Sequence, residues 1–262
     1  MNSSHEINQN YLTLLIKKIL AYFKIGIVRT NGILERRKNL IVECQEEDEQ
    51  NIKLALNFAL AAKPNLWSII QSINYIAENS IDGDLVECGV FKGGSLGLIS
   101  LYAQKHLLKS NIYGYDTFDK GFLNDTLSKN DYTVKGMQVK SKDFESPNNF
   151  YPSKKNVEDN LKKFSLNEKY FPFLIQGNIL ETLKNKNKIP SKISFLRLDT
   201  DLYLTTKYQL EVLYPRLQIG GVLHIDDYGF CPGVRKAVDE YFLNKKIWLH
   251  RVDLSCRLMI KN

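Results

Sequence analysis

Cysteine is scarce in this sequence, and the four cysteines that occur are far apart. They stand at positions 44, 88, 231 and 256, form no CxxC pair and have no spacing typical of a zinc site. The pattern therefore predicts reduced thiols, as in a cytoplasmic protein, and places Cys88 and Cys256 in buried strands.

Long apolar runs are also missing. No stretch of about 18 uncharged apolar residues occurs, which argues against a helix that spans a membrane. Residues 1–15 lack the basic, apolar and small-residue sections of a secretory signal. Both absences favour a cytoplasmic protein.

The basic residues outnumber the acidic ones but form no nucleic-acid-binding pattern. The net charge is +7, yet the lysines are dispersed and no aromatic-rich motif of RNA-binding sheets accompanies them. We expect a small-molecule or glycan substrate and no nucleic acid. The net charge slightly favours a substrate that is anionic.

Residues 1–80 are expected to form a helical region that acts as a cap or a dimerisation element. Apolar residues recur at helical spacing over 11–28, with lysines on another face. Such a helix packs on a core or a second subunit, or lies on a membrane surface; packing is the favoured alternative. Further helices are expected over 54–62 and 66–77, separated at Pro64. The region predicts a homodimer or higher homo-oligomer.

Residues 81–262 show strand and helix patterns in alternation. This order predicts a mostly parallel sheet with helices on both faces. The strands are expected at 84–88, 112–116, 173–176, 193–198 and 222–225. The helices are expected at 95–105, 157–164, 205–217 (stopped by Gly220 and Gly221) and 233–243.

Two further features qualify this α/β pattern. Residues 248–252 and 256–260 read as strands joined by too few residues for a parallel crossover, so they form an antiparallel hairpin and complete a seven-stranded sheet. Residues 119–153 have no clear periodicity. A connection of that length inside a compact domain predicts a lid or an insertion near a functional site.

A glycine-rich loop follows the first expected strand. Its spacing, E-x-G-x-x-x-G-G-S, differs from the G-x-G-x-x-G of dinucleotide-binding loops and places an acid at the strand end. That acid would repel a pyrophosphate and attract a cationic ligand. A tight turn without any ligand is the alternative. The candidate ligand-binding residues are Glu87, Cys88, Gly89, Gly93, Gly94 and Ser95.

Polar residues also follow the second and third strands. Asp116 ends the second strand, where a carboxylate is suited to accept both ribose hydroxyls of an adenosine. Gln176, Gly177 and Asn178 follow the third strand at the same edge and are candidates to contact the adenine ring. A helix cap or a solvated turn is the alternative for Asp116.

Aspartates follow the fourth and fifth strands. Asp199 and Asp201 come after one, and Asp226 and Asp227 after the other. Carboxylates gathered at one edge repel each other and raise their own pKa values unless a cation neutralises them. Ligation by oxygen alone suits Mg²⁺ or Ca²⁺ better than zinc. His224, inside the fifth strand, is expected to be a hydrogen-bonded core residue.

With these residues in view, the chain resembles the macrocin O-methyltransferase (TylF) family. The resembling blocks are long and collinear and cover about residues 83–243. They are Val86–Ser95, Leu198–Tyr203, Leu213–Leu217, Gly220–Gly229 and Pro232–Val238. The resemblance implies a Rossmann-like class I methyltransferase fold and a magnesium-dependent transfer of methyl from S-adenosylmethionine to a sugar hydroxyl.

The resemblance also implies residue roles. Asp199, Asp226 and Asp227 match the family's magnesium ligands, and Glu87, Gly89 and Asp116 match its cofactor-binding positions. Asp199 is also the candidate catalytic base, although a metal-bound carboxylate is a weak one.

The expected acceptor is a glycosylated natural product or a bacterial surface glycan. The alternatives are a catechol-type small-molecule methyltransferase and a non-catalytic binding or scaffold protein that kept the fold. A nicotinamide-dependent dehydrogenase is disfavoured by the glycine spacing and the C-terminal hairpin.

Overall fold

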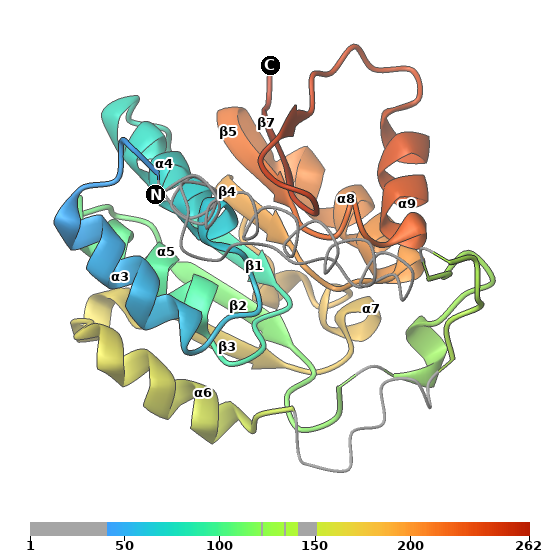
Figure 1. The fold of residues 1–262 in the computed structure, drawn as a ribbon, viewed down its shortest axis with the longest axis horizontal. Coiled ribbons are helices and arrows are strands. Elements are labelled where there is room, and N and C mark those ends of the chain that lie inside the picture. The colour runs from blue at the N-terminus through green and yellow to red at the C-terminus, as the bar shows by residue number, and fades with distance from the viewer. Residues whose placement is uncertain (1–40, 122, 134, 141–150) are drawn as a thin grey trace, which may run out of the picture. The chain divides into compact units, whose positions relative to one another are not determined.

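The computed structural model describes residues 41–121, 123–133, 135–140 and 151–262 (Figure 1). The chain divides into two units, Met1–Glu43 and Cys44–Asn262, and the second unit is described below. The helix expected over 11–28 lies outside the described residues. Among those that are described, no helix is both long and apolar enough to cross a bilayer.

The second unit is built on one seven-stranded sheet, as predicted. Its strand order is β3-β2-β1-β4-β5-β7-β6. Strands β1 to β5 run parallel, whereas β7 is antiparallel to both β5 and β6. The strands are β1 (Asp84–Cys88), β2 (Ile112–Asp116), β3 (Phe173–Gln176), β4 (Ile193–Leu198), β5 (Leu217–Ile225), β6 (His250–Arg251) and β7 (Arg257–Ile260).

Helices cover both faces of the sheet (Figure 1). Alternate strand residues contribute to two separate cores, because successive side chains point to opposite faces. One core contains Leu85 and Phe195 with helices α3 (Glu46–Leu56), α4 (Lys63–Glu78), α5 (Gly94–Lys105) and α6 (Lys154–Leu161). The other contains Val86 and Leu196 with helices α7 (Ile179–Thr182), α8 (Tyr203–Leu213) and α9 (Pro232–Phe242).

Short 3₁₀ helices connect several of these elements. They are η1 (Asn124–Thr126), η3 (Lys162–Phe164), η4 (Glu168–Tyr170), η5 (Lys186–Lys188) and η6 (Tyr214–Arg216).

The chain order reverses at β1, which lies between β2 and β4. Crossovers after β1 and β2 build one half of the sheet, and β4 and β5 build the other. Such a reversal leaves a crevice beyond the carboxyl ends of the two central strands, where open parallel sheets bind ligands. The glycine loop after β1 and Asp199 after β4 both border this crevice.

The prediction of a helix over residues 54–62 is wrong. Helix α3 spans Glu46–Leu56, and its first turn consists of four acidic residues: Glu46, Glu47, Asp48 and Glu49. Negative charges stabilise the positive end of the helix dipole. The segment after α3 leaves the helix and packs on the glycine loop, where the Gly94 amide donates to the Phe58 carbonyl at 3.0 Å.

The boundary between α8 and β5 was also misplaced. Helix α8 ends at Leu213 and not at 217, because Pro215 follows and cannot continue it. Strand β5 begins at Leu217 and runs through both glycines, which accommodate an irregularity in its pairing with β4.

The predicted antiparallel hairpin is confirmed but shorter, since β6 spans only two residues. The four cysteines are free thiols, and Cys88 and Cys256 are buried as predicted.

Candidate functional site

A cavity of about 620 Å³ lies at the carboxyl ends of β1, β2, β4 and β5. Its volume is typical of small-molecule sites. Residues after each of these strands line it: Gly89, Asp116, Asp199 and Asp226. The loop at residues 59–62 and the segment 253–255 also contribute to its wall.

The glycine loop must pass very close to the end of β4. The Asp199 amide donates to the Cys88 carbonyl at 2.8 Å. Gly89 has a φ of +89°, and a Cβ placed there would be 1.7 Å from the Asp199 carbonyl oxygen. Only glycine fits this position. The loop then reaches Gly93, whose φ of +91° starts helix α5.

Asp116 organises the same loop. One carboxylate oxygen accepts the amides of Val90 and Phe91 at 2.7 and 2.9 Å, and the other accepts the Phe118 amide at 2.8 Å. These bonds fix the end of β2 against the loop after β1. Asp116 also lines the cavity, so its carboxylate is within reach of a ligand there.

The predicted cofactor-binding residues divide into two groups. Gly89, Ser95, Asp116, Gly177 and Asn178 line the cavity. The remaining candidates lie outside its described lining: Glu87, Cys88, Gly93, Gly94 and Gln176. Asn178 caps helix α7 and donates to the Asp125 carboxylate at 2.7 Å, so its side chain anchors the loop after β2.

Glu87 was expected to face a cationic ligand, but its surroundings in the structure are different. Its side chain is fully buried, and Oε1 accepts a hydrogen bond from Arg197 at 2.9 Å. Burial raises the pKa of Glu87 to about 7, although Arg197 opposes the shift. The charge of Glu87 is therefore directed at Arg197 and not at the cavity.

Arg197 was missed by the sequence analysis. It lies within β4, is 1% exposed, and its guanidinium binds Glu87, Asp199 and Asp226. An arginine in an otherwise apolar strand, two residues before an aspartate, is a signal for a buried counter-ion. Buried charges are retained only when they are paired.

The three predicted metal ligands lie together. Asp199, Asp226 and Asp227 each offer a carboxylate oxygen, and these oxygens lie within 4.8 Å of one another. The Asp227 amide is held by the Ser255 hydroxyl at 3.0 Å, and the Asp226 carboxylate accepts Arg197 at 2.6 Å. Both contacts fix the turn after β5, so this cluster is preorganised.

The electrostatics of the cluster fit a cation. Burial, joined by the neighbouring carboxylates, raises the pKa values of Asp199 and Asp227. Burial is the largest single influence on Asp226, but the Arg197 guanidinium, His224 and the hydrogen bonds from Asn65 and the Asp227 amide together outweigh it and lower the pKa of that carboxyl. Among the described lining residues, six aspartates face one basic side chain, Arg197. A bound cation would relieve this repulsion.

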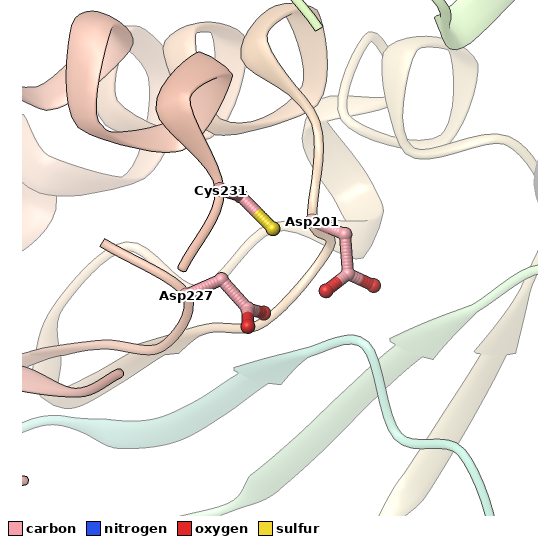
Figure 2. A group of neighbouring side chains, drawn as sticks. All are labelled: Asp201, Asp227 and Cys231. Carbon is pink, nitrogen blue, oxygen red and sulfur yellow. The ribbon is translucent and has the colours of Figure 1, made fainter. Parts of the chain in front are cut away.

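A second group of possible ligands shares Asp227. Figure 2 shows Asp201 and Asp227 with Cys231, at the start of α9. Burial raises the pKa of Asp201 to about 6 and that of the Cys231 thiol above its usual range. A protonated thiol is a poor ligand, and magnesium prefers oxygen. The all-oxygen cluster therefore suits a hard cation better.

Other sequence expectations have clear outcomes. His224 is a buried core residue, as predicted, with the Ser68 hydroxyl 3.0 Å from Nε2. Two tyrosines, Tyr115 and Tyr151, belong to the described lining of the cavity.

Comparisons with known proteins identify the family of this chain. Residues 18–259 match the model of the family described as macrocin-O-methyltransferase (TylF). The chain is 28% identical over 184 residues to demethyldecarbamoylnovobiocin O-methyltransferase of Streptomyces niveus, covering 67% of this chain and 64% of that protein.

A second curated relative is 27% identical over 170 residues, covering 64% of this chain and 61% of its own length. It is the 8-demethyl-8-(2,3-dimethoxy-alpha-L-rhamnosyl)-tetracenomycin-C 4'-O-methyltransferase of Streptomyces olivaceus. The chain thus spans less than two thirds of both relatives.

Among solved structures, the O-methyltransferase NovP superposes with a TM-score of 0.67 at 25% identity, covering 78% of this chain and 82% of that one. Because the family model matches most of its length, the chain belongs to the macrocin O-methyltransferase (TylF) family.

Proposed function

We propose that this protein is an S-adenosylmethionine- and magnesium-dependent O-methyltransferase that acts on a sugar hydroxyl of a glycosylated natural product or a surface glycan. The observation that carries the proposal is one cavity with two chemically different ends. Asp116 and the glycine loop form one end, and the Asp199, Asp226 and Asp227 cluster forms the other. Family membership supports the reaction class.

The first end fits S-adenosylmethionine. Gly89 lets the loop after β1 lie against the end of β4 in the cavity wall, and Asp116 offers a carboxylate to the ribose hydroxyls. The acidic lining suits a cofactor with ammonium and sulfonium groups. When bound, this cofactor supplies the methyl group for displacement by the acceptor oxygen.

The second end fits Mg²⁺. Asp199, Asp226 and Asp227 would hold the ion, which when bound lowers the pKa of a coordinated hydroxyl. The protein's own contribution is positioning, because Arg197 and Ser255 fix two of these aspartates. Asp199, with 29% of its side chain exposed, is the candidate proton acceptor.

Apolar residues favour an acceptor sugar that carries an apolar group. Leu60, Phe230 and Leu254 line the cavity while remaining 76%, 51% and 64% exposed. Their free surface would be buried by an aglycone, which favours binding. The curated relatives, by their names, act on such glycosides.

Calorimetry tests the cofactor, and methyl transfer tests the reaction. We expect binding of S-adenosylmethionine without binding of NAD, and methylation of demethyldecarbamoylnovobiocin or methyl α-L-rhamnopyranoside in preference to a catechol such as 3,4-dihydroxybenzoate. Binding of NAD alone would contradict the methyltransferase assignment. Methylation of the catechol alone would support the catechol-type alternative.

Two further expectations stay predictions. A cytoplasmic location rests on the free cysteines, and a homo-oligomer rests on the helical region expected over residues 1–80. Light scattering on the full chain measures the oligomeric state directly.

A further inference from the structure

Asn65 is a buried polar residue that reaches the metal end of the cavity from outside the sheet. It lies in the first turn of α4, is 1% exposed and lines the cavity. Its Nδ2 donates to Asp226 Oδ2 at 2.8 Å. Asn65 therefore touches one member of the aspartate cluster directly, although 161 positions separate the two residues.

The orientation of the Asn65 carboxamide is determined by Asp226. Reversing the amide would place Oδ1 against Asp226 Oδ2, an oxygen that already accepts a hydrogen bond from Arg197 at 2.6 Å, so two acceptor atoms would face each other. Consequently Nδ2 is the carboxamide atom that faces Asp226, and Oδ1 takes no part in this contact. It is buried and has no hydrogen-bond partner among the described residues. Buried acceptors normally have a partner, so this atom calls for a donor from a ligand.

The lining of the cavity restricts which ligand groups can donate a hydrogen bond to Asn65 Oδ1. The described cavity lining is rich in aspartates, so an ionised phosphate or carboxylate, which also lacks a hydrogen to donate, is disfavoured there. The cofactor end of the cavity, marked by the glycine loop, Asp116 and Gly177, lies at the ends of β1, β2 and β3, whereas Asn65 contacts the residue after β5. A hydroxyl of an uncharged acceptor has a hydrogen to donate and carries no negative charge. Bound at the aspartate cluster, it also lies away from the cofactor end of the cavity.

We propose that Asn65 is an acceptor-recognition residue whose Oδ1 accepts a hydrogen bond from one hydroxyl of a neutral sugar bound at the aspartate cluster. The assignment rests on the proposed function. Through Nδ2 the same side chain also holds Asp226, so it links acceptor recognition to the ligand cluster.

A ligand-deletion cycle tests this assignment. Methyl α-L-rhamnopyranoside and its 2-, 3- and 4-deoxy analogues are titrated calorimetrically into wild type and Asn65→Ala, with S-adenosylhomocysteine and MgCl₂ present. In wild type, one deoxy analogue should bind about tenfold more weakly than the parent through loss of this bond. In Asn65→Ala that difference should disappear, while differences for the other analogues persist.

Controls separate recognition from support of the fold. Asn65→Leu keeps the side-chain volume and should give the same pattern if Asn65→Ala is too unstable to titrate. Asn74→Ala removes an asparagine of the same helix whose carboxamide pairs with His106, and should behave as wild type. Affinity for S-adenosylhomocysteine should stay unchanged in all three variants.

The results that overturn the assignment are distinct. If every deoxy analogue loses as much affinity in Asn65→Ala as in wild type, Oδ1 receives no acceptor hydroxyl. If Asn65→Ala weakens only Mg²⁺ binding, its role is limited to supporting Asp226. If wild type binds neither the rhamnoside nor demethyldecarbamoylnovobiocin, the sugar-acceptor function itself fails, and this assignment fails with it.

Discussion

Arg197 compensates three carboxylates in the interior of the site. Its guanidinium binds Glu87, Asp199 and Asp226 from near the carboxyl end of β4. A single buried cation shared in this way fixes the spacing between the ends of β1, β4 and β5. Its removal should leave Glu87 and part of Asp226 without a partner in a region that excludes water.

Arg197→Met should therefore destabilise the protein by about 3–5 kcal/mol, because breaking a buried ion pair leaves uncompensated charge. Urea unfolding followed by circular dichroism measures the change. Arg235→Met, which removes an exposed arginine bonded to the Tyr228 and Gly229 carbonyls, should cost less than about 1 kcal/mol. Equal stability of Arg197→Met and wild type would contradict the charge account.

Glu87 should make stability depend on pH. Its pKa in the folded state is about 7, above the ordinary 4.5, so the folded state holds this proton more tightly than the unfolded state. The resulting stabilisation is fully present below pH 4.5 and is lost as pH rises through 7. In Glu87→Gln the decline of the unfolding free energy between pH 5 and 8 should be smaller, by up to about 3 kcal/mol. Identical pH profiles would show that Glu87 does not titrate there.

Cys231 distinguishes the two possible ligand groups. If magnesium binds the all-oxygen cluster, Cys231→Ser should change the Mg²⁺ dissociation constant by less than about threefold, since the thiol is a soft donor. Asp226→Asn should weaken it far more. Isothermal titration with MgCl₂ measures both constants. A large loss in Cys231→Ser would favour the group with Asp201 shown in Figure 2.

At the scale of elements, the buried strands were the most predictable part. The first four expected strands have the observed bounds. For β1, β2 and β4 the reason is that buried apolar runs begin and end abruptly, whereas β3 is a partly exposed edge strand. Element ends set by tertiary contacts were not predictable. Helix α3 stops early because residue 58 must bond to the glycine loop, a contact 36 positions away in sequence that no local pattern reveals.

The start of α8 depends on a side chain from the loop after β2. The N-cap residue Leu202 provides no side-chain acceptor. Instead Asp131 Oδ1 accepts the Tyr203 amide at 2.7 Å, while Oδ2 accepts the Ser128 amide at 2.8 Å. Asp131 therefore attaches this loop to the helix that follows Asp199 and Asp201.

Asp131→Ala should cost about 1–2 kcal/mol of stability, the usual effect of losing a helix cap. Thermal unfolding measures it. Asp125→Ala, which loses only an exposed bond to Asn178, serves as the matched control from the same loop. If both variants unfold at the same temperature, Asp131 does not act as the cap of α8.

At the scale of the whole molecule, the net charge gave a misleading prediction of the substrate's charge. The pattern of strands and helices gave a useful prediction of where the aspartates lie. The chain carries +7, which favoured an anionic substrate, yet the described cavity lining is acidic. Net charge is a sum over the surface and contains no information about one concave region. The alternation of strands and helices, by contrast, correctly predicted a parallel sheet, and the residues after its neighbouring strands β4 and β5 lie together at one edge.

The parts of the site that the sequence did not reveal come from inside elements. Arg197 is within a strand and Asn65 within a helix, so neither stands at a loop position where functional residues are usually sought. Both were recognisable only once the fold brought them to the aspartates.

The most direct test of the cation-assisted methyltransferase account is the dependence of methyl transfer on Mg²⁺ in wild type and in Asp226→Asn/Asp227→Asn. Transfer from S-adenosylmethionine to demethyldecarbamoylnovobiocin or methyl α-L-rhamnopyranoside is followed with EDTA and with increasing MgCl₂. We predict loss of activity in EDTA, recovery with Mg²⁺, and a decrease of roughly 100-fold or more in the double variant with cofactor affinity retained. Equal, EDTA-resistant activity in both proteins would contradict the account.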